Sequence, residues 1–267
     1  MSRARQYVAD AAVLLFASLA FGQAASIPTD NELAQITARG RLLYEYDQAA
    51  WHSSDAAMAT NPSKENLGRY IAQKTGAGWI VAFGRLNEAR DAFQIATLAT
   101  QGQTTQDFSV KKFDPPEKDT GFFLVAAKAI EVSLKDFQGA NWPYNVAVLP
   151  APAGQLYVYV YPAQKENGVY PLGADARYLV SPDGATVVEK RQLHKSIIPT
   201  GGPVPVGTTF VAGTHSHILS NVPEDTDVFY VLTRKPSMPE YIGTQIAIYV
   251  VNADGTISVV ERIKKHR

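Results

Sequence analysis

Two histidines stand one residue apart in the segment GTHSHILSNVPEDTD (213–227), and three acidic residues follow them within a dozen positions. In a β-strand, residues i and i+2 point to the same face, so His215 and His217 can reach a single ion. Imidazole nitrogen and carboxylate oxygen are both common zinc ligands. With a third ligand from 224–227, a fourth position stays open for water, which zinc makes nucleophilic near neutral pH. One interpretation of the segment is therefore a zinc site.

A purely structural interpretation of the same segment needs no ion. His215 and His217 can instead hydrogen-bond the neighbouring acids and hold a loop in place. In that case Ser220 or Asp225 would cap a short helix beginning near Thr226. A pair of histidines at this spacing is a weak motif by itself, so the segment alone leaves both interpretations open.

The context of the two histidines resembles the JAMM (MPN/JAB) metallopeptidase superfamily, whose pattern is roughly H-x-H-P, a short loop, and P-S-x-x-D. Here His215 and His217 match the histidines, and Pro223 and Asp227 match the P…D pair if the loop is one residue shorter. The resemblance covers about residues 195–255. It implies that His215, His217 and Asp227 bind zinc and that the domain is similar to JAB-like domains of uncharacterised bacterial secreted proteins.

Three departures from the family pattern concern the catalytic residues rather than the ligands. Ile218 stands where the family often has proline, and Glu224 stands where it has the serine that helps to hold the oxyanion. The family's catalytic glutamate has no counterpart in the strand expected after residues 120–137. Glu189 or Glu224 would serve as the base only if the fold brings it within hydrogen-bond reach of the metal-bound water.

Two functions remain open at this point. The first is a non-catalytic binding or envelope protein on a JAMM-like scaffold, with a protein, peptide or cell-wall partner. The second is a zinc-dependent peptidase or isopeptidase that uses the His215/His217/Asp227 site. The first fits the missing glutamate, and the second requires an acid close to the two histidines.

Other candidate residues receive a structural interpretation. Asp47, His52 and Asp55 can form a polar pocket, but a helix end with an ordinary His52–Asp55 ion pair and a buried Trp51 is the simpler alternative. A lone strand histidine is usually a satisfied or exposed side chain, and His194 is interpreted in this way rather than as a further ligand.

The strand expected at 156–162 places three tyrosines on one face, which suggests either a surface for a glycan or peptide or a half-covered sheet face. The chain contains no G-x-S-x-G motif, so a serine triad is unsupported. It also contains no P-loop and no dinucleotide fingerprint.

The N-terminal segment 1–25 has the pattern of a secretory signal, with Arg3 and Arg5 before the apolar run AAVLLFASLAF and small residues after it. We therefore expect a periplasmic or secreted protein. The chain has no cysteine, so its core must hold it without disulfides. Basic and acidic residues balance at 25 each, which gives no support for a nucleic-acid partner, and no further apolar run is long enough to span a membrane.

The hydrophobic periodicity predicts an α+β protein with N-terminal helices and a β-hairpin, followed by a strand-rich, JAB-like, mixed or antiparallel sheet with a packed helix. The expected domains are 26–118 and 119–267, or one continuous domain over 26–267. The expected helices are 30 to the mid-fifties, a second from Ser63 to about Gly76, and 120–137. The expected strands and loops are 78–86 and 92–100, the polar segment 101–118, strands from 144 onward, a loop at 197–207, and a final hairpin of 244–251 and 256–263.

Overall fold

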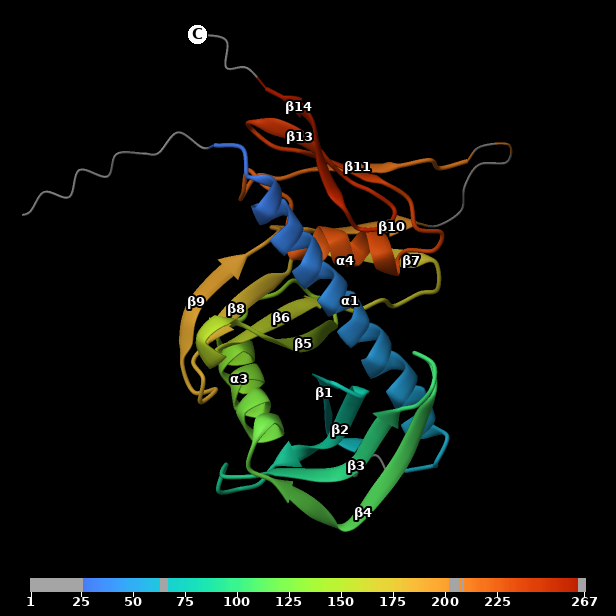
Figure 1. The fold of residues 1–267 in the computed structure, drawn as a ribbon, viewed down its shortest axis with the longest axis vertical. Coiled ribbons are helices and arrows are strands. Elements are labelled where there is room, and N and C mark those ends of the chain that lie inside the picture. Colours follow the sequence, from blue (N-terminus) through green and yellow to red (C-terminus); the bar gives the residue numbers. More distant parts are fainter. Residues whose placement is uncertain (1–25, 63–66, 202–206, 208, 264–267) are drawn as a thin grey trace, which may run out of the picture.

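The computed structural model describes residues 26–62, 67–201, 207 and 209–263 (Figure 1). The predicted secretory signal lies outside the described residues. Three helices and four mostly antiparallel sheets confirm the predicted α+β class for the described part of the chain.

The helices are α1 (Asp30–Met58), α3 (Phe122–Asp136) and α4 (Asp225–Thr233). The sheets have the strand orders β1-β2-β3-β4, β5-β6-β8-β9, β10-β7 and β11-β12-β13-β14. The strands are β1 (Arg69–Thr75), β2 (Gly78–Leu86), β3 (Phe93–Gln101), β4 (Phe108–Asp119), β5 (Tyr144–Pro150), β6 (Leu156–Pro162), β7 (Val169–Gly173), β8 (Ala176–Val180), β9 (Val187–Gln192), β10 (Ile197–Gly201), β11 (Gly213–Ser216), β12 (Glu240–Gly243), β13 (Ala247–Val251) and β14 (Ile257–Arg262).

The long helix α1 joins the parts of the molecule, because it runs from the β13–β14 hairpin at one end to the β1–β4 sheet at the other (Figure 1). It begins with the predicted capping box, in which Thr29 and Glu32 satisfy each other's backbone N–H groups. Leu43 and Tyr46 on its inner face are fully buried. Burying such a side chain contributes about 1.5–3 kcal/mol, so packing rather than intrinsic helix propensity holds α1.

The second predicted helix is wrong: residues 69–75 form β1, which pairs with β2 across a tight turn at residues 76–77. Ile71 and Ala72 are both buried although they point to opposite faces of the sheet, because α3 lies toward one face and α1 toward the other. A strand that is covered on both faces has no polar–apolar alternation, so its sequence does not show the period of a strand.

The other predicted elements are mostly confirmed. The hairpin of β2 and β3, the helix α3 and the final hairpin of β13 and β14 occur where the sequence predicts them. The predicted loop at 197–207 is wrong for its first part, since β10 pairs with β7. Part of the polar segment 101–118 belongs to β4, a mostly exposed strand that pairs with β3.

Three hydrophobic clusters fill the described structure, and each of them includes residues from both sides of position 118. Val158 and Val160 on one face of β6 enter the cluster beneath α3. Tyr159 and Tyr161 on the other face enter the cluster beneath α1 and are almost fully buried. The alternation predicted for β6 is therefore confirmed, and the protein covers most of its tyrosine face, with Tyr157 half-buried.

Helix α4 is held against α1 by a close backbone contact and by a buried ion cluster. A Cβ atom on Gly40 of α1 would lie 2.5 Å from the carbonyl oxygen of Asp225, so glycine permits the approach. The Asp225 carboxylate accepts hydrogen bonds from Arg39 at 2.9 Å, from Tyr159 at 2.8 Å and from Arg177. Since Asp225 is the first residue of α4, these contacts set where the helix begins and thus where Asp227 lies.

Candidate metal centre

Four side chains from three separate segments meet at one buried point. His194 follows β9, His215 lies on β11 with His217 directly after it, and Asp227 is the third residue of α4. One donor atom from each side chain lies within 4.8 Å of all the others. The site forms where the ends of two sheets meet the N-terminus of α4.

The donor atoms have the spacing of a coordination shell. Nε2 of His217 lies 3.0 Å from Nε2 of His194 and 3.1 Å from Nε2 of His215. Oδ1 of Asp227 lies 3.1 Å from Nε2 of both His194 and His215, and Oδ2 lies 3.2 Å from Nε2 of His217. Ligands at 2.0–2.1 Å in a tetrahedral zinc site are about 3.3 Å apart, so most of these distances fit one small ion.

The outer nitrogen of each imidazole faces a hydrogen-bond acceptor. Nδ1 of His194 lies 2.8 Å from Asp175, Nδ1 of His215 lies 3.0 Å from Glu240, and Nδ1 of His217 lies 2.8 Å from the carbonyl oxygen of Val222. An acceptor at Nδ1 keeps the proton there in a neutral ring. Each Nε2 is then left with a lone pair that points at the common centre, as in histidine metal ligands oriented by a second shell.

Three lone pairs and a carboxylate facing each other repel unless a positive charge lies between them. Oδ1 of Asp227 is fully buried and, within the described residues, has only the imidazole Nε2 atoms of His194 and His215 near it. Its partner atom Oδ2 accepts the backbone N–H of Glu224 at 2.6 Å in the capping box of α4. One carboxylate oxygen therefore anchors the helix, and the other is left as a ligand atom.

When no metal is bound, protons on the imidazoles supply the positive charge between the donor atoms. Burial opposes the charged form of His215, but hydrogen bonds to Asp227 and Glu240 outweigh it and raise the pKa of His215 to about 9. Burial likewise opposes the charged form of Asp227, yet the surrounding histidines hold the pKa of that carboxyl well below its usual range. The site thus selects cations, and a metal must displace protons to enter it.

The backbone orients both strand histidines. β11 pairs with β12 in parallel, so Gly213 lies opposite Glu240 and His215 lies opposite Ile242. The N–H of His217 donates to the carbonyl oxygen of Gly243 at 2.8 Å, which extends the ladder past the end of β11. His215 and His217 consequently reach the same centre, as their spacing predicts.

The structure brings together all three residues of the predicted site, His215, His217 and Asp227, and adds His194. The interpretation of His194 as a lone side chain misses its position at the centre. No local signal identifies it, because its contact with His217 spans 23 residues. The supporting acids Asp175 and Glu240 also went unrecognised in the sequence.

Neither candidate for a catalytic base reaches the centre in a usable form. Glu189 is an exposed residue of β9. Glu224 is buried, but it pairs with Arg191 at 2.6 Å and caps α4, whereas Ser220 and Asp225 do not cap it. Burial raises the pKa of Glu224, and the nearby Arg191 opposes this shift.

The second candidate cluster lies on α1, away from the metal centre. Asp47 accepts a hydrogen bond from Tyr161 at 2.9 Å, and His52 stacks on Trp51. Trp51 is 56% exposed, so the prediction that it is buried is wrong. The described residues show no His52–Asp55 ion pair.

A cavity of about 160 Å³ reaches the metal centre from outside. The three histidines His194, His215 and His217 line it together with the polar residues Lys195, Ser196 and Ser216. Its apolar lining comes from Leu172, Leu193, Ile198, Ile218 and Leu219. A small molecule can therefore approach the histidine side of the centre, although the carboxylate side is closed.

Comparison with known proteins identified no match to a family model, to a curated protein or to a solved structure. Among the described helices, none combines the length and apolar character that crossing a bilayer requires.

Proposed function

We propose that this protein is a non-catalytic binding protein whose C-terminal part is held together by one transition-metal ion, with zinc as the first candidate. The ligands are Nε2 of His194, His215 and His217 and Oδ1 of Asp227. The observation that carries the proposal is the buried Oδ1 of Asp227, whose only neighbours among the described polar groups are two Nε2 atoms at 3.1 Å. The outer nitrogens of both imidazoles already face acceptors.

The donor set favours zinc-like metals. Three imidazoles and one carboxylate suit zinc, copper, nickel or iron better than calcium or magnesium, which prefer all-oxygen sites. Four protein ligands are typical of structural zinc, whereas catalytic zinc keeps a position for water. A bound ion would tie the segment after β9, strand β11 and helix α4 to each other.

A zinc-dependent peptidase or isopeptidase using the same centre is the second candidate, and the cavity beside the histidines is the observation that favours it. The arrangement of acids speaks against it. Asp175 and Glu240 each face an imidazole Nδ1, and Glu224 is paired with Arg191. Within the described residues, no carboxylate at the centre is left over to act as a general base.

The JAMM-like scaffold remains part of the proposal. It is supported by the strand β11, which carries His215 and ends one residue before His217, and by the following helix, whose third residue is the aspartate ligand. His194 as a further ligand and Glu224 as the helix cap both depart from that family's pattern. We also propose, from the segment 1–25 alone, that the protein is exported. A protein, peptide or cell-wall partner belongs to the proposed non-catalytic function.

Elemental analysis of the purified protein tests the metal proposal. The wild-type protein should carry about one zinc per chain, and His194→Ala and His217→Ala should each lose it. His52→Ala is the matched control, because His52 lies outside the centre and should keep the metal. Full zinc retention in His194→Ala, with loss in His217→Ala, would contradict the four-ligand site. It would favour the three-ligand site that the peptidase function requires.

Cobalt substitution distinguishes the two candidate functions. A closed set of four ligands gives a tetrahedral cobalt(II) spectrum that azide does not change. A spectrum that shifts on addition of azide would show an open position and would favour the hydrolase. Turnover of peptide or isopeptide substrates by the zinc-loaded protein, abolished in His217→Ala, would establish that function.

A further inference from the structure

A second hollow lies along α1 and shares no lining residue with the cavity at the metal centre. We call this hollow the α1 cleft, and its volume is about 670 Å³. Asp47 and Trp51 line it from α1, Asn145 from β5, and Lys235 from the segment after α4. A smaller cavity of about 60 Å³ has Asp47 and Asn145 in common with it and deepens the cleft toward Tyr161.

The floor of the cleft carries polar atoms with free hydrogen-bonding capacity. The carboxylate of Asp47 accepts one hydrogen bond, from Tyr161, and has no ion-pair partner within the described residues. Thr233 also lines both cavities, but its hydroxyl oxygen is fully buried and does not face the cleft. The carboxylate of Asp47 therefore has capacity to accept a further hydrogen bond, and a ligand that donates one is favoured.

The charge of the cleft excludes strongly charged ligands. Its described lining contains one acid, Asp47, and one base, Lys235. The remaining polar groups are amides, such as those of Asn145 and Gln164, and hydroxyls. Amides and hydroxyls donate as well as accept hydrogen bonds, so they suit a neutral ligand rich in hydroxyl groups.

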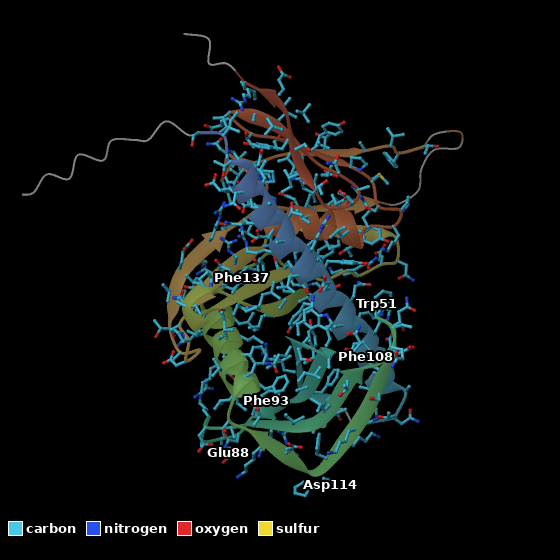
Figure 2. All side chains as sticks on the ribbon, in the orientation of Figure 1. Trp51, Glu88, Phe93, Phe108, Asp114 and Phe137 are labelled. Carbon is cyan, nitrogen blue, oxygen red and sulfur yellow. The ribbon has the colours of Figure 1, made fainter. Side chains whose placement is uncertain are left out.

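The cleft also offers an aromatic surface in a polar setting. Trp51, which Figure 2 labels beside α1, is 56% exposed although it is a large apolar side chain. Tyr70 and Tyr170 line the same cleft. An exposed indole beside amides and a carboxylate can stack against an apolar ring face while the polar groups bind its edge.

We propose that the α1 cleft binds a neutral saccharide of about two sugar units, with Trp51 stacking on a ring face and Asp47, Asn145 and Gln164 bonding its hydroxyl groups. Sugar rings have this combination of an apolar face and a polar edge. The size also agrees, because small-ligand sites have volumes of about 300–1,000 Å³. The site is independent of the metal centre and gives the proposed non-catalytic protein a specific ligand class.

The test is an NMR titration of the isotope-labelled full chain with cellobiose, maltose and N,N′-diacetylchitobiose. At least one disaccharide should shift the Trp51 indole signal and the backbone signals of 47–54, 145 and 233–235, with a Kd of about 1 mM or below. Choline and inorganic phosphate are the charged control ligands and should leave these signals unchanged.

Variants then assign the contacts. Trp51→Ala and Asp47→Ala should each weaken binding of the responding disaccharide about tenfold or more, which corresponds to one anchor contact. Asp55→Ala is the matched control, since Asp55 is an exposed acid on the same helix outside the cleft. The wild-type titration stands by itself if a variant fails to fold.

Three results would overturn the proposal. The first is the absence of shifts at the cleft with all three disaccharides at tens of millimolar, well above the expected Kd. The second is binding of choline or phosphate at the cleft in place of the sugars. The third is unchanged disaccharide affinity in folded Trp51→Ala and Asp47→Ala proteins.

Discussion

Nε2 of His194 lies 3.0 Å from Nε2 of His217. The Nδ1 atom of each ring faces a hydrogen-bond acceptor, which is Asp175 for His194 and the carbonyl oxygen of Val222 for His217. Two neutral imidazoles in this orientation would point lone pairs at each other. The contact is therefore stable only with a proton or a metal ion between the rings. This relationship and the adjacent Asp227 support the proposed metal centre.

Removal of the metal should destabilise the protein. A ligand that binds only the folded state at 1,000 times its Kd contributes about 4 kcal/mol. For a domain of this size, that corresponds to a fall in Tm of about 8–16 °C on chelation. Calorimetry with and without EDTA measures the change. His194→Ala should start from the lower Tm and show no response to EDTA, and equal Tm values for chelated and untreated wild type would contradict the prediction.

The acid behind His194 should matter although it does not touch the proposed ion. Asp175 lies 2.8 Å from Nδ1 of His194 and is almost fully buried. Asp175→Asn weakens this orienting contact, so zinc affinity should fall about 10- to 100-fold. A competition titration with a chromogenic chelator measures it. Glu189→Gln, an exposed change on β9, should leave the affinity as in wild type. An unchanged affinity in Asp175→Asn would show that the second shell does not orient the ring.

The contact between α1 and α4 should tolerate no side chain at position 40. A Cβ there would lie 2.5 Å from the Asp225 carbonyl oxygen and from Cβ of Val228. Gly40→Ala should therefore destabilise the fold by about 1–3 kcal/mol and, by displacing α4, weaken metal binding. Urea unfolding measures the first effect. Gly76→Ala is the control, since no atom lies within 4 Å of its added Cβ. Equal stability of the two variants would mean that the helices separate at little cost.

The stability of the protein should depend on pH through Asp47. Burial raises the pKa of Asp47 to about 6 from its ordinary value of 3.8, although the hydrogen bond from Tyr161 opposes the shift. The folded state then binds the proton more tightly than the unfolded chain, so stability present at pH 4 is lost as the pH rises through 6. The loss at pH 7 is at most about 3 kcal/mol.

Asp47→Asn removes the charge and should abolish this loss. Unfolding free energies from urea titrations at pH 4 and pH 7 are compared for wild type and variant. From pH 4 to pH 7, the unfolding free energy of the variant should rise by about 1–3 kcal/mol relative to that of the wild type. Asp55→Asn should gain nothing, and a gain of the same size there would assign the effect to general surface charge.

Local patterns predicted the elements that have a strong period or a capping signal. The box at Thr29 and Glu32 located the start of α1, and the apolar spacing over 120–137 located α3. The pattern failed for β1, since Ile71 and Ala72 are buried on opposite faces. It failed for Trp51, because the side of α1 that meets the cores is decided by contacts with distant strands.

The sequence by itself determined the α+β class and the pairing of His215 with His217, because both depend on local periods of the backbone. Asp227 was indicated by the resemblance to the JAMM pattern, in which an aspartate follows the two histidines after a short loop. Only the tertiary structure decided that His194, Asp175 and Glu240 join them, since these contacts span 19 to 25 residues. Likewise, only folding placed Asp47 of α1 next to Tyr161 of β6, across 114 residues. Contacts at such separations depend on how whole elements pack, and no local pattern records that.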